Sequence, residues 1–153
     1  MQKRNLIKLP DRMAEFSIQI DKDPKELHRV EHEMLKLPFA QNCEREILDE
    51  IYTILEEMLL NIINYGFKGA ESKKHDISVI FRQEGDTLTL IFKDNGAPFN
   101  PLTKLRTDTE RDEFNLQMNI GGWGINMVRD FSEHLDYKRD GEFNIFTVTK
   151  KIN

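Results

Sequence analysis

Alternating apolar and polar residues predict five β-strands that are each half-buried against a core. Residues 16–20 show this period-two pattern first. Residues 77–82 and 88–93 repeat it on either side of a Glu-Gly-Asp turn and predict a hairpin. A second hairpin is predicted near the end of the chain, where residues 135–139 and 144–150 flank an Asp-Gly turn.

Apolar residues at helical spacing predict three helices between these strands. The first follows Asp23-Pro24 and continues to Leu37-Pro38. The second is longer, from about residue 44 to residue 65, and the third runs from about Gly124 to Glu133. The apolar stripe of the long helix consists of Ile47, Ile51, Ile54, Leu55, Met58, Leu59 and Ile62.

The order of these elements predicts an α/β sandwich, in which helices cover one face of a mixed, mostly antiparallel sheet. Residues 1–12 are polar and are expected to form a loose lead-in, and residues 13–153 are expected to form one domain. The segment 100–119 is polar and weakly periodic. Loops of this length are uncommon inside a compact domain and are often functional, for example as an active-site lid.

Composition excludes several classes of function. The net charge of -5 argues against a nucleic-acid-binding protein or one that binds anionic membranes, because both need a basic face. No apolar run approaches the roughly 20 residues of a transmembrane helix, and the N-terminus lacks the apolar core of a signal peptide. Cys43 is the sole cysteine, which favours the reducing cytoplasm.

Glu57 and Asn61 lie one turn apart in the long predicted helix, so their side chains share a face. The apolar stripe around them turns this face toward the sheet, where an unpaired carboxylate is costly. A bound Mg²⁺ would explain the placement, because the Asn61 amide oxygen and phosphate oxygens are suitable ligands. Glu57 could then act as a general base toward a hydroxyl or water that attacks a γ-phosphate. The alternative is a solvated acid and amide on the helix rim.

Asp94 ends an apolar strand and begins the sequence Asp-Asn-Gly-Ala-Pro-Phe. Its ionised carboxylate can accept two donors, which suits the exocyclic amine of adenine and a bridging water. Gly96 lets the backbone approach a flat base closely. The alternative is an ordinary Asp-Asn-Gly turn.

Gly121, Gly122 and Gly124 cluster just before the third predicted helix. Glycines there expose backbone N–H groups that could receive phosphates, although the usual P-loop signature is absent. The alternative is a flexible hinge between a loop and a helix.

Together these motifs resemble those of the GHKL ATPase superfamily. Residues 57–61 (Glu-x3-Asn) are similar to its N-box, and residues 94–101 and 121–125 are similar to its first and second glycine motifs. The short chain and the Pro-Phe-x-Pro sequence resemble, more narrowly, the anti-sigma-factor serine kinases of bacteria. The tail from Asp136 to Asn144 is similar to that group as well, so that the resemblance covers about residues 14–152.

The resemblance implies a Bergerat-type fold that binds Mg-ATP and phosphorylates a serine on a partner of the STAS type, an anti-sigma-factor antagonist. A sigma factor as second partner and a homodimer are also implied. By position, Glu57 would be the base, Asn61 the magnesium ligand and Asp94 the adenine reader. The glycines that would surround the base and the phosphates are Gly96, Gly121, Gly122 and Gly124. Many relatives carry histidine at the position of Tyr65.

The leading hypothesis is therefore a Mg-ATP-dependent serine kinase that also sequesters a regulator, with no direct contact to nucleic acid or membrane. One alternative is a nucleotide-gated binding module with little or no turnover, in which ATP orders the segment 100–119. Two further hypotheses are weaker. The ATP-binding half of a histidine kinase would need a dimerising helix pair with a phospho-acceptor histidine, and ATPases of the gyrase or chaperone type would need additional domains.

Overall fold

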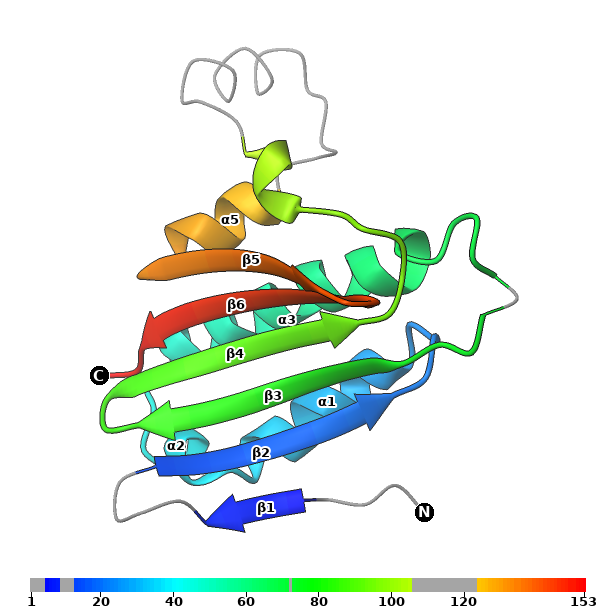
Figure 1. The fold of residues 1–153 in the computed structure, drawn as a ribbon. Coiled ribbons are helices and arrows are strands. Elements are labelled where there is room, and N and C mark those ends of the chain that lie inside the picture. The colour runs from blue at the N-terminus through cyan, green and yellow to red at the C-terminus, as the bar shows by residue number, and fades with distance from the viewer. Residues whose placement is uncertain (1–4, 9–12, 72, 106–123) are drawn as a thin grey trace.

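The computed structural model describes residues 5–8, 13–71, 73–105 and 124–153. Within these residues the strands form one six-stranded sheet in the order β1-β2-β3-β4-β6-β5 (Figure 1). The strands are β1 (Asn5–Lys8), β2 (Met13–Ile20), β3 (Ile77–Glu84), β4 (Thr87–Asp94), β5 (His134–Asp140) and β6 (Phe143–Lys151).

The main helices pack on one face of this sheet, as the sequence predicts. Figure 1 shows α1, α2 and α3 behind β2, β3, β4 and β6, with α5 beside β5. The helices are α1 (Glu26–Leu35), α2 (Pro38–Gln41), α3 (Arg45–Tyr65), the 3₁₀ helix η1 (Pro101–Lys104) and α5 (Gly124–Asp130). No helix in the described ranges is long and apolar enough to cross a membrane.

The five strand pairs are all antiparallel, in a sheet that we expected to be mixed but mostly antiparallel. Between β2 and β3 the chain passes through α1 and returns through α3, so β3 starts beside the end of β2. Ile20 consequently pairs with Ile77. These two helical passes, through helices that the sequence predicts, make β3 antiparallel to β2.

The polar lead-in expected for residues 1–12 is corrected at residues 5–8, which form β1. This strand pairs along the edge of β2, with Leu6 opposite Phe16. Four residues are too few to show a clear period-two pattern, so β1 could not be identified from its own sequence. It becomes evident only from its pairing with β2. The sequence also left α2 unassigned, and α1 begins at Glu26, slightly after the expected start at Asp23-Pro24.

The core lies between the sheet and the helices, and period-two strands meet the apolar stripe of α3 there. The most deeply buried side chains include Val30, Ile51, Ile54, Leu55, Leu59, Ile77, Val79, Leu88, Leu90, Val128 and Val148. Gly85 and Gly141, with φ of 60° and 57°, adopt the left-handed conformation that the tight turns of the two predicted hairpins need. The strand alternation thus fixes which side of β4 and β6 faces α3.

Candidate functional site

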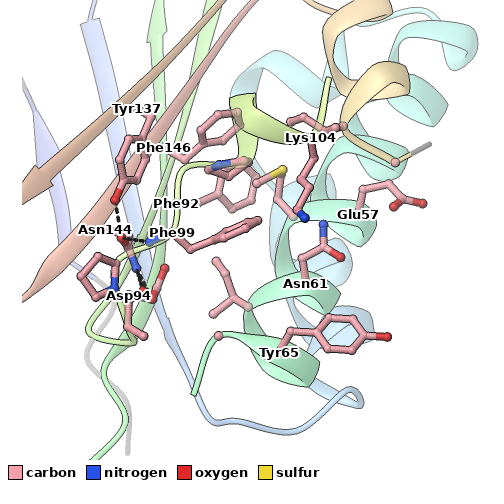
Figure 2. Close-up of a pocket in the computed structure, with 18 residues that line it drawn as sticks. Glu57, Asn61, Tyr65, Phe92, Asp94, Phe99, Lys104, Tyr137, Asn144 and Phe146 are labelled. Atoms are coloured by element: carbon pink, nitrogen blue, oxygen red, sulfur yellow. Dashed lines mark hydrogen bonds between the residues drawn. The ribbon is translucent and has the colours of Figure 1, made fainter. Parts of the chain in front are cut away.

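A cavity of about 670 Å³ opens between α3 and the ends of β4, β5 and β6 (Figure 2). This volume is within the usual range of small-molecule and cofactor sites. Its middle is lined by apolar side chains, and its polar groups lie at opposite sides. The apolar wall includes Met58, Ile62, Phe92, Ile125 and Phe146.

Glu57 and Asn61 line the α3 side of this cavity, as their spacing predicts. Figure 2 shows both side chains projecting from the same face of the helix. Burial raises the pKa of the Glu57 carboxyl above its ordinary value, and the carboxylate of the neighbouring Glu56 raises it further. A raised pKa lies closer to neutral pH, where a general base transfers protons most efficiently.

Gly124, the first residue of α5, lies directly against Glu57. A Cβ atom at Gly124 would overlap the Glu57 carboxylate, so a side chain at this position would displace it. Gly124 also lines the cavity. The structure therefore brings one glycine of the predicted cluster to the catalytic candidate. Gly121 and Gly122 lie outside the described residues, as do Trp123 and the part of the expected lid beyond residue 105.

Asp94 lies on the opposite side of the cavity, at the end of β4 (Figure 2), and only 5% of its surface is exposed. Its Oδ1 accepts hydrogen bonds from the Gly96 N–H at 2.9 Å and from the Asn144 side-chain amide at 3.1 Å. Burial raises the pKa of Asp94, and these two hydrogen bonds together with the charge of Arg139 oppose the rise.

At Gly96 the loop after β4 packs closely against the end of α3. The neighbouring Ala97 N–H donates to the carbonyl oxygen of Gly66, the residue that ends α3, at 3.1 Å. A Cβ atom at Gly96 would overlap this same carbonyl oxygen. Glycine is needed here because two backbone segments approach too closely for any side chain.

Three residues of the terminal hairpin hold this loop, and sequence reasoning gave none of them a role. Arg139 of β5 donates to the Gly96 carbonyl oxygen at 2.9 Å. Tyr137 donates its hydroxyl proton to Asn144 Oδ1 at 2.6 Å, and Asn144 contacts Asp94 directly. Register could have suggested the link, because β6 alternation places Asn144 on the buried side together with Phe146.

Lys104, which sequence reasoning also missed, adds a positive charge to the cavity lining from η1. Figure 2 shows its side chain reaching toward Asn61. Two aromatic side chains stay exposed at the same cavity: Tyr65 is 61% exposed and Phe99 is 45% exposed. Exposed aromatic rings at a cavity provide flat surfaces for a base or a sugar.

The arrangement fits a nucleotide with its metal ion. A buried carboxylate with a fixed orientation suits the amino edge of a base, and the apolar middle suits the rings. Glu57, Asn61 and Lys104 lie together on the other side. An amide oxygen and phosphate oxygens are suitable Mg²⁺ ligands, while an ammonium group suits the phosphates themselves.

Comparison with known families agrees with this geometry. The family model of the histidine kinase-like ATPase domain matches residues 20–150, which is most of the chain. The chain belongs to the histidine kinase-like ATPase family. It is therefore an ATP-binding domain of the GHKL superfamily, as its motifs indicated, and kinase or ATPase activity is the general activity of such domains.

A solved histidine kinase domain shares the fold of this histidine kinase-like ATPase. It is the histidine kinase domain of the blue-light activated histidine kinase from Erythrobacter litoralis EL346, with a TM-score of 0.52 and 14% sequence identity. The match covers 84% of the present chain and 60% of the Erythrobacter chain. No curated protein matches the sequence.

Proposed function

We propose that the protein is a Mg-ATP-dependent protein serine kinase that acts as an anti-sigma regulatory factor. Its proposed substrate is a serine of a STAS-type antagonist, and it also sequesters a regulator such as a sigma factor. The observation that carries the proposal is that one cavity has Asp94 on one side and Glu57 with Asn61 on the other. The serine specificity and the partners rest on the motif resemblance.

The base of ATP occupies the Asp94 side of the cavity in this proposal. The carboxylate accepts a hydrogen bond from the adenine amino group, and the Gly96 N–H holds this carboxylate in place through Oδ1. The phosphates reach the α3 side, where the Asn61 amide oxygen holds the metal ion and Lys104 contacts phosphate oxygens. Gly121, Gly122 and Gly124 contribute backbone N–H groups to the phosphates.

Glu57 is the base for phosphoryl transfer. Its carboxylate accepts the proton of the partner serine hydroxyl as the serine oxygen bonds to the γ-phosphorus. The bond between the γ-phosphorus and its bridging oxygen breaks, and ADP leaves. When bound, Mg²⁺ neutralises charge that develops on the phosphate oxygens. Because the pKa of Glu57 is raised, the transfer rate is expected to fall as pH drops through that pKa.

The test compares Glu57→Gln with Glu46→Gln, a control on the same helix whose exposed carboxylate does not line the cavity. Glu57→Gln is expected to reduce transfer of labelled γ-phosphate to a purified STAS-domain protein by about 100-fold or more, because the base is lost. ATP affinity in calorimetry should change by about two-fold at most, since Glu57 holds no base or sugar. Transfer at the wild-type rate in Glu57→Gln would contradict the catalytic role.

A nucleotide-gated binding module is the second candidate function. It is favoured by the position of η1, which lies at the start of the expected lid (residues 100–119) and lines the cavity with Pro101 and Lys104. A nucleotide in the cavity would contact this segment directly and could change which partner binds. ATP-dependent partner binding without any phosphoserine, measured by mass spectrometry on the wild type, would favour the module over the kinase.

A further inference from the structure

Asn144 lies next to Asp94 because of strand register. The two residues are opposite each other in the β4–β6 pair, at the end of β4 and the start of β6. Alternation along β6 places Asn144 on the same face as Phe146 and Val148, and Asn144 is only 6% exposed. A buried amide at this place must find hydrogen-bond partners, and the loop after β4 provides them.

Four hydrogen bonds fix the orientation of the Asn144 amide. Its oxygen accepts from the Phe99 backbone N–H at 3.1 Å and from the Tyr137 hydroxyl at 2.6 Å. Its nitrogen donates to the Ala97 carbonyl oxygen at 2.8 Å and to Asp94 Oδ1 at 3.1 Å. A backbone N–H can only donate and a backbone carbonyl can only accept, so the amide cannot be turned over.

This orientation leaves one oxygen of Asp94 for a ligand. Oδ1 already accepts from the Gly96 N–H and from Asn144. Among the described residues no hydrogen bond reaches Oδ2, while the carboxyl group lines the cavity. Oδ2 can accept a hydrogen bond from an amino group, whereas a carbonyl oxygen at the same place would face a like partial charge.

We propose that Asn144 is a positioning residue that sets base specificity, because it fixes Asp94 as a pure acceptor for bases with an exocyclic amino group. The inference rests on the proposed nucleotide binding and adds the residue that enforces its selectivity. Asn144 lies on the Asp94 side of the cavity, away from Glu57 and Asn61. Its proposed effect is therefore on binding of the base alone.

The protonation state of Asp94 links this role to pH. Burial raises the pKa of Asp94, and the Asn144 and Gly96 donors counteract the rise. The charged groups around it are Arg139 from β5 and, across the cavity, Glu57 from α3 and Lys104 from η1. Without the Asn144 donor the carboxyl would take up a proton at higher pH. A neutral carboxyl can donate to a carbonyl oxygen, which would weaken selectivity.

The experiment measures ADP and inosine diphosphate binding by calorimetry from about pH 5 to about pH 8.5. The two ligands differ at the ring position that carries either an amino group or a carbonyl oxygen. Wild type is expected to prefer ADP. Asn144→Leu should lower ADP affinity about ten-fold, reduce the preference for ADP, and move the acidic loss of ADP binding to higher pH.

Asn144→Asp provides a second variant of nearly the same shape. The introduced carboxyl can donate to Asp94 only when it holds a proton, so ADP affinity should decrease as pH rises, opposite to the wild-type trend. Damage to packing alone would not reverse the sign. Thr147→Val is the matched control, because Thr147 is on the same strand but on the opposite face, and it should leave both affinities unchanged.

Failure of the proposed function and failure of the role of Asn144 would give different binding results. If wild type binds neither diphosphate, the proposed function is wrong. If wild type prefers ADP while Asn144→Leu and Asn144→Asp keep the same preference and the same pH trend, the role of Asn144 is overturned. If Asn144→Leu does not fold, the pH trend of Asn144→Asp decides the question.

Discussion

At the scale of single residues, Asp94 shows how binding and stability oppose each other. Its carboxylate is buried, and burial raises its pKa above the ordinary value. The folded protein therefore holds this proton more firmly than the unfolded chain does. Linkage then requires that ionisation of Asp94 lowers stability as pH rises through the two pKa values. The charge is retained in the proposed site because a ligand needs an acceptor there.

Asp94→Asn is therefore expected to separate stability from binding. The amide oxygen can still accept from Gly96 and Asn144, while the amide nitrogen turns a donor toward the cavity. ADP binding should be lost in calorimetry. The thermal unfolding midpoint at neutral pH should be equal to the wild-type value or higher by about 3 °C.

The gain in the unfolding midpoint should disappear in acid, where wild-type Asp94 is itself neutral in the folded state. Scanning calorimetry at neutral and acidic pH measures this difference directly. A variant that unfolds well below wild type at neutral pH would show that the Asp94 charge stabilises the fold, contrary to its burial.

At the scale of elements, the contact between α3 and the loop after β4 links the two sides of the cavity. The Gly66 carbonyl oxygen accepts from the Ala97 N–H, and Gly96 packs against the same oxygen. The loop after β4, which follows Asp94, is thus hydrogen-bonded to the helix that carries Glu57 and Asn61. A change in this contact should disturb the loop and the helix together.

Gly96→Ala tests the contact. The added methyl group would overlap the Gly66 carbonyl, and neither backbone segment can move cheaply. We expect a loss of about 2 kcal/mol in the free energy of unfolding, together with about ten-fold weaker ADP binding. Urea denaturation and calorimetry measure the two effects.

Gly85→Ala is the matched control for Gly96→Ala. Gly85 has a positive φ but no neighbour within 4 Å of an added Cβ atom, so alanine strains only the β3–β4 turn. Its cost should be about 1 kcal/mol, with ADP affinity unchanged. Equal binding losses in both glycine variants would indicate general destabilisation and not a contact specific to the site.

Sequence patterns predicted most of these elements because α3 and the paired strands have strong, regular periodicity. They missed β1 and α2, which are too short for a period to show. Glu57, Asn61, Asp94 and Gly124 were recognised from local motifs, and the structure brings them to one cavity. Their assigned roles remain predictions.

Other parts of the site could not be read from local patterns. Asn144 contacts Asp94 across 50 positions of sequence. Lys104 looks like an ordinary surface charge in the sequence, and Arg139, although it lies in the tail that resembles the serine kinases, has no local pattern that gives it a role. Strand register and loop path, which emerge only in the folded chain, decide what these side chains contact.

At the scale of the whole molecule, Lys150 connects the sheet with two helices at the end of β6, opposite Leu88 and far from the β5–β6 turn. Its side chain is 7% exposed, forms an ion pair with Glu50 of α3, and donates to the carbonyl oxygen of Phe131, just after α5, at 2.7 Å. One cation thus holds β6, α3 and the end of α5 together. Removing it leaves a partly buried carboxylate without this partner.

Lys150→Met is expected to lower the free energy of unfolding by about 2 kcal/mol. Glu50 is 27% exposed, so water limits the penalty. Lys151→Met, which changes the exposed neighbour on the same strand, should change stability by about 0.5 kcal/mol or less. Urea denaturation compares the two variants, and the folded Lys150→Met protein should bind ADP normally because Lys150 does not line the cavity. A neutral result would mean that the ion pair contributes no net stability.

The contact between Gly66 and the loop after β4 also determines which ligands can contact both sides of the cavity. Glu57 and Gly66 belong to one continuous helix and its cap, nine residues apart, so about 13 Å of helix separates the two ends. A nucleoside near Asp94 is too short to reach Glu57, whereas an extended triphosphate can contact both. Inserting one residue between them would lengthen this separation and also rotate Glu57 by about 100° around the helix axis. A helix segment of fixed length therefore limits which ligands can contact both sides of the cavity.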